Sequence, residues 1–356
     1  MKALTTMCFT LWVLVFCGCL FGEEQVSLLG RSFDGLNRAA GPEISKPDCT
    51  VWRVPGFDPI EDVPAIGNWK GDFQVSGAGN CYAVSVLTNY FFQRTNFSPA
   101  QGGAFMDWLK AGKIDSPLNV DNETSLKFMA YWLATRSDDK VTLGGYRSLR
   151  QMTKGESLAA TRFKQWAEAL QYHHQTKAEL HRYGGSILKS KLGFIPGLGS
   201  DAVIKDGCNI IRDRIRDDKR PVPIVLHPNG GNLAAGHVIL AYEMREYEDK
   251  IEILAWDVNY PPTDSDARST VVTVCKDKWN YKARRYDGEQ RYKYELITVI
   301  NPDGRRERKM VKDILTNYKE TLERNSHLGN VVSEGNSIGD RIKGVAGFIG
   351  EHLNPF

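Results

Sequence analysis

The stretch GAGNCYAVSVLT, residues 77–88, decides how the rest of the chain is interpreted. Two glycines close a polar loop, and the sequence turns apolar immediately after Cys81. Apolar residues then recur at helical spacing as far as Phe91, so the pattern predicts a loop that leads into a buried helix. Cys81 would lie in its first turn, where free backbone N–H groups and the helix dipole favour a thiolate over a thiol. Locally, Cys81 fits a nucleophile and an ordinary buried core cysteine equally well.

The composition is that of a globular protein with a full hydrophobic core. The chain has 356 residues, of which 42% are hydrophobic and 25% charged, and its net charge is only +3. This length is enough for one large domain or two small ones. The near-balanced charge does not decide about nucleic acid, but no RNA- or DNA-binding signature occurs. We therefore predict no nucleic-acid partner.

Residues 1–22 have the features of a secretory signal. Lys2 is the only charge among them, and residues 7–21 are almost wholly apolar. A small residue directly before Cys19 resembles the bacterial lipobox without its usual leucine, which would make Cys19 the lipidated first residue. Cleavage near Gly22 without a lipid, and an uncleaved membrane anchor, are the alternatives. We predict an exported protein, either secreted or periplasmic, or attached to the cell envelope through Cys19 or the apolar segment.

The remaining cysteines do not form a dense disulfide framework. Four of them follow the signal segment, namely Cys49, Cys81, Cys208 and Cys275. If Cys81 must stay a free thiol, at most one disulfide can form, with one cysteine left over.

The order of the expected elements predicts an α+β fold, because helices come first and strands second. An N-terminal extension, 23–60, and a loop, 61–80, precede the helices. Helices are expected at 81–92, from Ser98-Pro99 onward, after Asn122, at 161–180 and at 202–215. Ser98 and Pro99 would be the N-cap and the first residue of their helix. A short strand is expected within 140–146. Strands are expected at 222–226, 237–242, 251–256, 269–275 and 294–300. A helical C-terminal extension, 301–356, follows them.

Two of these strands carry the polar residues that a nucleophilic cysteine requires. His237 begins the apolar run GHVILAY, 156 residues after Cys81. Asp257 follows the next apolar run directly, and Asn259 lies two residues later. A histidine that acts as general base needs a third group to fix its tautomer and hold its ring. Asp257 and Asn259 both meet this requirement.

At this point a family resemblance can be stated. The stretch 79–85, GNCYAVS, resembles the active-site stretch of papain-like cysteine peptidases, where Gly-Ser-Cys-Trp-Ala-Phe-Ser is typical. Residues 236–238 are similar to the family's histidine strand. The stretch 255–262, with its Asp-x-Asn-Tyr-Pro, looks more like the bacterial papain-like and C39-like peptidases than the plant or lysosomal ones. The resemblance covers residues 61–300 and implies a papain-like catalytic domain, with a helical subdomain that holds the nucleophile helix and an antiparallel β subdomain.

The sequence also departs from the family pattern. The distance of 156 residues between cysteine and histidine is slightly longer than usual. Ala78 replaces the family's cysteine three positions before the nucleophile, so the neighbouring disulfide is lost. Gln74, the candidate for the oxyanion glutamine, lies seven residues before Cys81 instead of six, and other donors could take its role. The chain before the domain is too short for the inhibitory prosegment of many members.

The resemblance implies a mechanism and a function. Cys81 would attack a carbonyl group as thiolate, and His237 would act first as base and then as acid. Asp257, or alternatively Asn259, would hold the His237 ring, and Gln74 would support the oxyanion. We expect a peptidase that acts on protein or peptide substrates without a metal or cofactor. A transglutaminase-like acyltransferase, and a papain-like binding protein that has lost its chemistry, are the alternatives.

Other polar residues are weaker candidates for a site. His227 precedes a proline turn without a following orienter. The pair His173 and His174 is expected on a solvated helix face, where adjacent side chains diverge and do not form a two-ligand metal site. A group of acidic and amide side chains could suggest calcium, but its two prolines and missing closing glutamate favour a polar turn; its members are Asp257, Asn259, Asp264 and Asp266.

Overall fold

The structure is a computed structural model. It describes residues 49–66, 80–110, 116–135, 139–177, 199–228, 236–259, 269–277, 280–284, 291–292, 294–300 and 305–323. Several expectations lie outside these residues: the signal segment with Cys19, the loop with Gln74, the positions Asp264 and Asp266, and the chain after residue 323.

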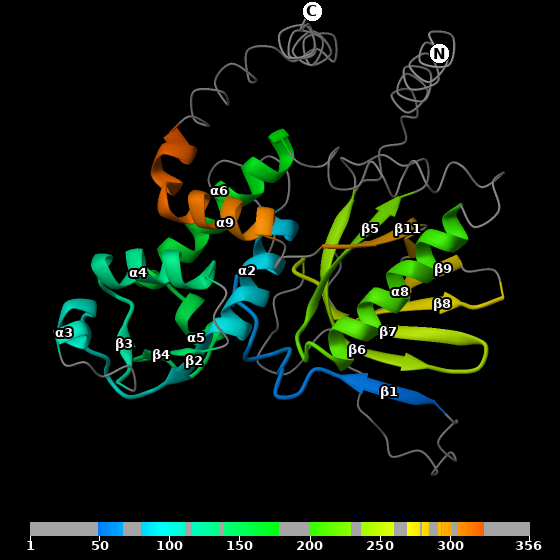
Figure 1. The fold of residues 1–356 in the computed structure, drawn as a ribbon, viewed down its shortest axis with the longest axis horizontal. Helices are drawn as coiled ribbons and strands as arrows, with labels where there is room; N and C mark the ends of the chain where they lie inside the picture. The colour runs from blue at the N-terminus through cyan, green and yellow to red at the C-terminus, as the bar shows by residue number, and fades with distance from the viewer. Residues whose placement is uncertain are drawn as a thin grey trace, which may run out of the picture.

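One half of the fold is mainly helical (Figure 1). Its helices are α3 (Phe105–Lys110), α4 (Glu123–Leu133), α5 (Leu149–Thr153) and α6 (Leu158–Lys177). α9 (Arg305–Thr316), from the end of the described chain, packs against α4 and α6. A small parallel sheet of order β2-β4-β3 lies beside them; its strands are β2 (Thr95–Ser98), β3 (Leu118–Asn119) and β4 (Val141–Gly144).

The other half is an antiparallel sheet of order β10-β9-β8-β7-β6-β5-β11. Its strands are β5 (Val222–Pro228), β6 (His237–Glu246), β7 (Lys250–Trp256), β8 (Ser269–Cys275), β9 (Asn280–Arg284), β10 (Arg291–Tyr292) and β11 (Tyr294–Val299). β1 (Thr50–Arg53) pairs with the second half of β6, beyond the part that pairs with β5. α8 (Ser200–Arg216) covers one face and buries a stripe spaced three to four residues apart, from Val203 to Ile215.

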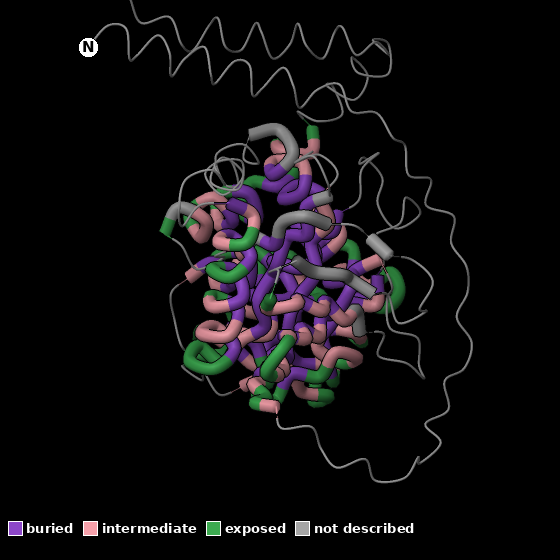
Figure 2. The backbone as a smooth tube through the Cα atoms, turned by 90° about the vertical axis from the view of Figure 1, so that its right-hand side faces the viewer, coloured by how far each residue is buried: buried purple, intermediate pink, exposed green. Residues whose placement is uncertain are grey.

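The helix α2 (Cys81–Arg94) lies between the two halves (Figure 1). It contacts β5 and β6 on one side and α4 and α6 on the other. Its residues Cys81–Phe91 are all buried. A helix without a solvated face is stable only in the core of a large fold. The backbone coloured by burial agrees, because buried segments run through the middle of the molecule and exposed ones lie outside (Figure 2).

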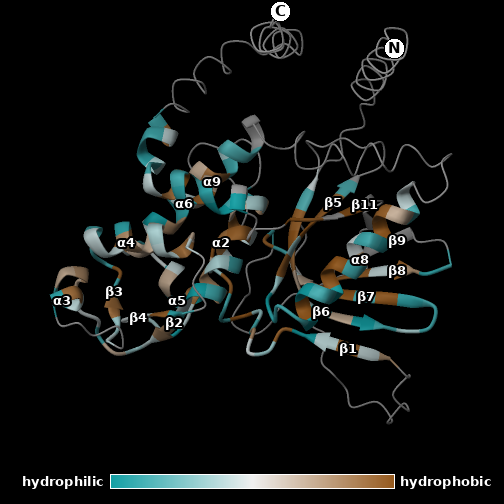
Figure 3. Ribbon diagram, viewed as in Figure 1, coloured by the Kyte–Doolittle hydropathy of each residue, from teal (hydrophilic) through white to brown (hydrophobic). Residues whose placement is uncertain are grey.

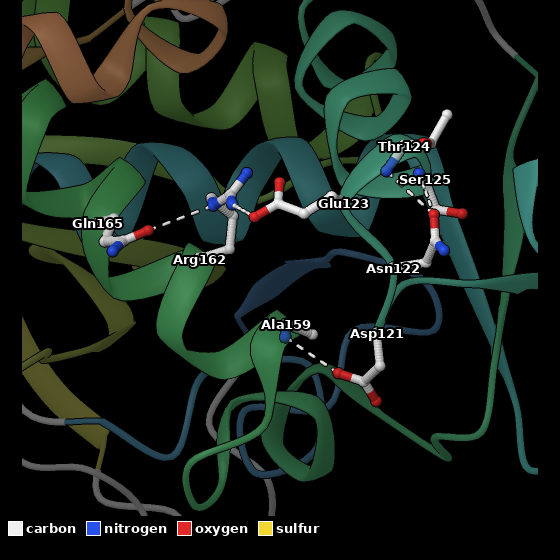
Figure 4. A network of polar contacts seen from close by, with 8 residues as sticks. All are labelled: Asp121, Asn122, Glu123, Thr124, Ser125, Ala159, Arg162 and Gln165. Atoms are coloured by element: carbon white, nitrogen blue, oxygen red, sulfur yellow. Dashed lines mark hydrogen bonds and ion pairs between the residues drawn. The ribbon is translucent and has the colours of Figure 1, made fainter.

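A polar network fixes the helices that support α2 (Figure 4). Asn122 caps α4, since its side-chain oxygen accepts from the backbone N–H groups of Thr124 and Ser125 at 3.0 and 3.2 Å. Glu123 then pairs with Arg162 of α6 at 2.6 Å. The hydrogen bond from Arg162 is the main reason why the pKa of Glu123 is lowered. These contacts join the N-terminal parts of α4 and α6.

The α+β prediction is confirmed, and most expected helices and strands are present. The helix expected from Ser98-Pro99 is wrong, because Ser98 ends β2 in pairing with Gly144 and the helix begins only at Phe105. The chain between them passes β3 so closely that a Cβ atom on Gly102 would lie 2.4 Å from the backbone nitrogen of Asn119. Sheet pairing therefore overrides the local helix signal.

Two further findings extend the prediction. β1 belongs to the main sheet although its residues fall in the expected N-terminal extension, so the sheet draws on chain ahead of residue 61. β6 continues to Glu246, past its expected end at residue 242. Its outer part is hydrophilic (Figure 3) and is held by ion pairs of Glu243 with Arg245 and Arg53 at 2.6 and 3.8 Å. The four described cysteines are all free thiols.

Candidate active site

Three chain segments bring Cys81, His237 and Asp257 together. Cys81 is the first residue of α2, and His237 is the first residue of β6. β6 and β7 run antiparallel with Leu240 opposite Trp256, so the end of β7 lies beside the start of β6. Asp257, the next residue after β7, therefore reaches the His237 ring. α2 packs against β6, which brings its first turn to the same place.

The His237 ring interacts with both Cys81 and Asp257. Nε2–H donates to Asp257 Oδ1 at 2.7 Å. The thiol of Cys81 makes a side-chain hydrogen bond with the same ring. The cysteine, imidazole and carboxylate thus follow one another in the order that a nucleophile, a base and an orienting group require.

Asn259 supports this arrangement mainly through its backbone. Its backbone N–H donates to Asp257 Oδ1 at 2.9 Å. Its side-chain Nδ2 lies 3.3 Å from His237 Nε2, and two N–H donors cannot bond to each other. Between the two orienting residues expected from the sequence, the geometry therefore favours Asp257, and Asn259 fixes the carboxylate of Asp257.

The environment keeps the His237 ring protonated. Burial alone would lower the pKa of His237. The charge of the Asp257 carboxylate, the hydrogen bond to it and the contact with Cys81 oppose this effect and raise the pKa to about 10. The carboxylate itself is 95% buried, since its side chain keeps only 5% exposure, whereas the ring keeps 15%. An imidazolium beside a cysteine stabilises the thiolate, which is the reactive form.

The N-terminus of α2 is not capped by the side chain of the residue that precedes it. Asn80 makes no side-chain capping hydrogen bond. Gln171 of α6 instead accepts from the N–H of Ala83 with its side-chain oxygen at 3.2 Å. The N–H of Cys81 lies ahead of this contact, at the positive end of the helix. A backbone donor there, next to the thiol, suits the oxygen of a tetrahedral intermediate.

Tyr82 ties this turn to the helical half. Its ring stacks on His174 of α6, with ring centroids 3.7 Å apart and an angle of 7° between the planes. Its hydroxyl donates to a carboxylate oxygen of Glu307 on α9. Tyr82 is fully buried, and His174 is 3% exposed. The expected solvated position of His174 is therefore wrong: the stacked ring of Tyr82 covers it.

The other candidates lie elsewhere. His227 is a buried residue of β5, opposite Leu296, and burial lowers its pKa to about 4. It is a neutral core histidine at physiological pH. Among the residues that the structure describes, no group of three or more His, Cys, Asp and Glu side chains could hold a metal ion. Likewise, no helix in the described ranges is long and apolar enough to cross a membrane.

Sequence reasoning missed the residues that support the site. Gln171, His174 and Glu307 each contact the first turn of α2 from more than 80 positions away in the chain. None of them has a motif of its own. The polar composition of residues 171–174 in α6 pointed to solvent instead of to a buried partner.

In comparisons with known proteins, no family model, no curated protein and no solved structure matches the chain.

Proposed function

We propose that this protein is an exported cysteine peptidase with a papain-like fold. The observation that carries the proposal is the hydrogen-bonded series Cys81, His237 and Asp257 at the N-terminus of a buried helix. The division into a helical half and an antiparallel sheet, with the cysteine helix between them, supports the papain-like fold. The stretch 77–88 and the order of the three residues support it from the sequence.

In the proposed reaction, the thiolate sulfur of Cys81 forms a bond to the carbonyl carbon of a peptide. The electrons of the C=O bond move to its oxygen, which the backbone N–H of Cys81 stabilises. The imidazolium of His237 then gives its proton to the leaving amine as the C–N bond breaks, and a thioester remains. Water attacks the thioester after His237 removes its proton. The C–S bond then breaks, the carboxylic acid leaves, and the thiolate of Cys81 and the imidazolium of His237 are restored.

Asp257 holds the ring during both half-reactions. Its carboxylate accepts from Nε2–H, which holds the ring beside the sulfur. It also stabilises the positive ring that exists before attack and again during water activation. Gln74 remains a proposed second donor to the oxyanion.

Selective alkylation tests the proposal, because the chain contains its own control thiols. Cys49 and Cys275 are more exposed than Cys81, and burial raises the pKa of Cys208 to about 12. Iodoacetamide near pH 6 should modify Cys81 before the two more exposed cysteines, as measured by mass spectrometry of each peptide. In His237→Ala, this preference should disappear. Equal rates at Cys81 and Cys275 in the wild type would refute the activated thiol.

Turnover is tested with an unfolded protein substrate. Hydrolysis should fall by on the order of 10⁴-fold or more in Cys81→Ala. Cys275→Ala is the matched control and should keep the wild-type rate. Addition of a primary amine separates peptidase from acyltransferase: an amide product in place of a free acid would assign the transglutaminase-like alternative. An activated thiol without turnover of either kind would contradict the peptidase.

Export is tested separately by the N-terminus of the mature protein. Expression in a bacterial host with radiolabelled fatty acid distinguishes a lipidated Cys19 from cleavage near Gly22. A full-length protein that stays in the cytosol would contradict export and leave the proposed chemistry untouched.

A further inference from the structure

A cavity of about 860 Å³ lies away from the candidate active site and is lined by cationic side chains. Neither Cys81 nor His237 nor Asp257 borders it. Its six cations are Arg94, Lys140, Lys219, Arg220, Arg305 and Arg308. Among the described residues that line it, the only carboxylate is Asp218. The lining therefore carries a strong positive charge, although the chain as a whole is nearly neutral.

The single carboxylate is already engaged. Asp218 Oδ2 accepts from Arg220 at 2.8 Å and from Arg214, which lies outside the cavity lining, at 2.9 Å. It therefore fixes the direction of Arg220, and it is one carboxylate against six cations in the described lining. Lys140 is placed by a different contact, since its Nζ lies 4.9 Å from the centroid of the Phe92 ring. Phe92 and Pro55 supply apolar parts of the wall.

The cations come from four segments that are distant in sequence. They are the end of α2, the residue before β4, the turn between α8 and β5, and the start of α9. This turn contains Lys219 with a φ of 52°, which among the described residues is the only non-glycine residue with positive φ. A side chain in this region is uncommon and costs energy, so the fold holds the turn in place. The fold thus brings cations from separate segments to one cavity, which a run of charged residues in a single segment would not do.

We propose that this cavity binds a compact polyanion that carries several phosphate groups. Four of the six cations are arginines, whose planar forks match phosphate oxygens in two-point contacts. The volume is that of a small-molecule site. A nucleic acid would need a basic track along the surface that is longer than this one cavity. The proposal is independent of the chemistry at Cys81.

Calorimetric titration of the full chain with inorganic tripolyphosphate tests the proposal. We expect saturable binding with a single site per chain at low salt, and weaker binding at about 0.15 M salt because screening reduces charge attraction. The double variant Arg305→Gln/Arg308→Gln should bind at least about tenfold more weakly. The variant Lys219→Gln/Arg220→Gln changes lining residues from another segment and should give a similar loss.

The matched control is Lys309→Gln/Lys319→Gln, which removes the same charge from exposed positions near α9 that do not line the cavity. It should bind as the wild type does, and circular dichroism should give the same fold for all three variants. Equal weakening by the control would mean that only net charge matters, and this result would overturn the proposal. Absence of tripolyphosphate binding by the wild type at low salt would overturn it as well.

Two further ligands identify the source of the phosphates. Vesicles that contain a phosphoinositide test a lipid headgroup, and a soluble nucleoside triphosphate tests a free metabolite. If binding of the vesicles or of the nucleoside triphosphate depends on Arg305 and Arg308, the result supports the site and shows where its phosphate ligand comes from. Tighter binding of a single-stranded oligonucleotide than of tripolyphosphate, unaffected by these two arginines, would contradict it.

Discussion

Replacement of Asp257 by asparagine should change the titration of His237 more than any other single substitution near the site. The variant keeps the size of the side chain and removes its charge. In the wild type, the carboxylate and its 2.7 Å hydrogen bond oppose burial and raise the pKa of His237 from 6.5 to about 10. Without the charge, burial remains as the largest effect. We therefore expect the pKa of His237 in Asp257→Asn to fall below 6.5.

The same shift predicts how stability depends on pH. The folded protein holds a proton on His237 more tightly than the unfolded chain does. The resulting stabilisation is fully present below pH 6.5, the ordinary value, and is lost as the pH rises towards about 10. A shift of this size corresponds to at most about 5 kcal/mol. Urea denaturation of the wild type should show this loss across the interval, whereas Asp257→Asn should not.

Nuclear magnetic resonance of the histidine ring carbons measures the pKa directly. His237→Gln identifies the His237 signal among the seven histidines. Asn259→Ala is the control, because it keeps the Asp257 charge and should leave the pKa close to 10. If the His237 signal of Asp257→Asn still titrates near 10, the carboxylate is not the cause, and the reasoning about the ring is refuted.

Three further substitutions test the packing that supports the site by urea denaturation. Tyr82→Phe removes the hydrogen bond to Glu307 and should lower the free energy of unfolding by roughly 1.5–3 kcal/mol, while Glu307→Gln in the Tyr82→Phe background should cost little more. Gln171→Ala leaves the buried N–H of Ala83 without its acceptor and should cost about 1–3 kcal/mol; no change would mean that water replaces the amide. Ile239→Ala opens a cavity in β6, where the side chain is fully buried, and should cost about 2–5 kcal/mol; a loss below 1 kcal/mol would show that the site collapses around it.

The helices and strands that hold the candidate site were predictable because their periodicity is strong. α2 carries apolar residues at helical spacing, and β6 begins with a continuous apolar run after His237. The expected partners Cys81, His237 and Asp257 meet because both histidine and aspartate lie at one end of adjacent antiparallel strands. Local sequence contains this information once the strands are recognised.

Features that depend on distant contacts were not predictable. β1 is mostly exposed and lacks alternation, so only its pairing with β6 makes it a strand. Ser98-Pro99 has a helix-start signature, but the parallel pairing of β2 with β4 determines its conformation. The cationic cavity is assembled from four separate segments, each with an ordinary number of charges. In each case the deciding free energy comes from packing between segments, which a single sequence does not display.

The contact between Tyr82 and Glu307 joins residues 225 positions apart. A ribosome therefore makes α2 long before its partner Glu307. Until α9 has emerged, the turn that carries Cys81 lacks this support, and a shortened chain that ends before residue 305 never acquires it. The order of synthesis thus delays completion of the candidate site until α9 has been made.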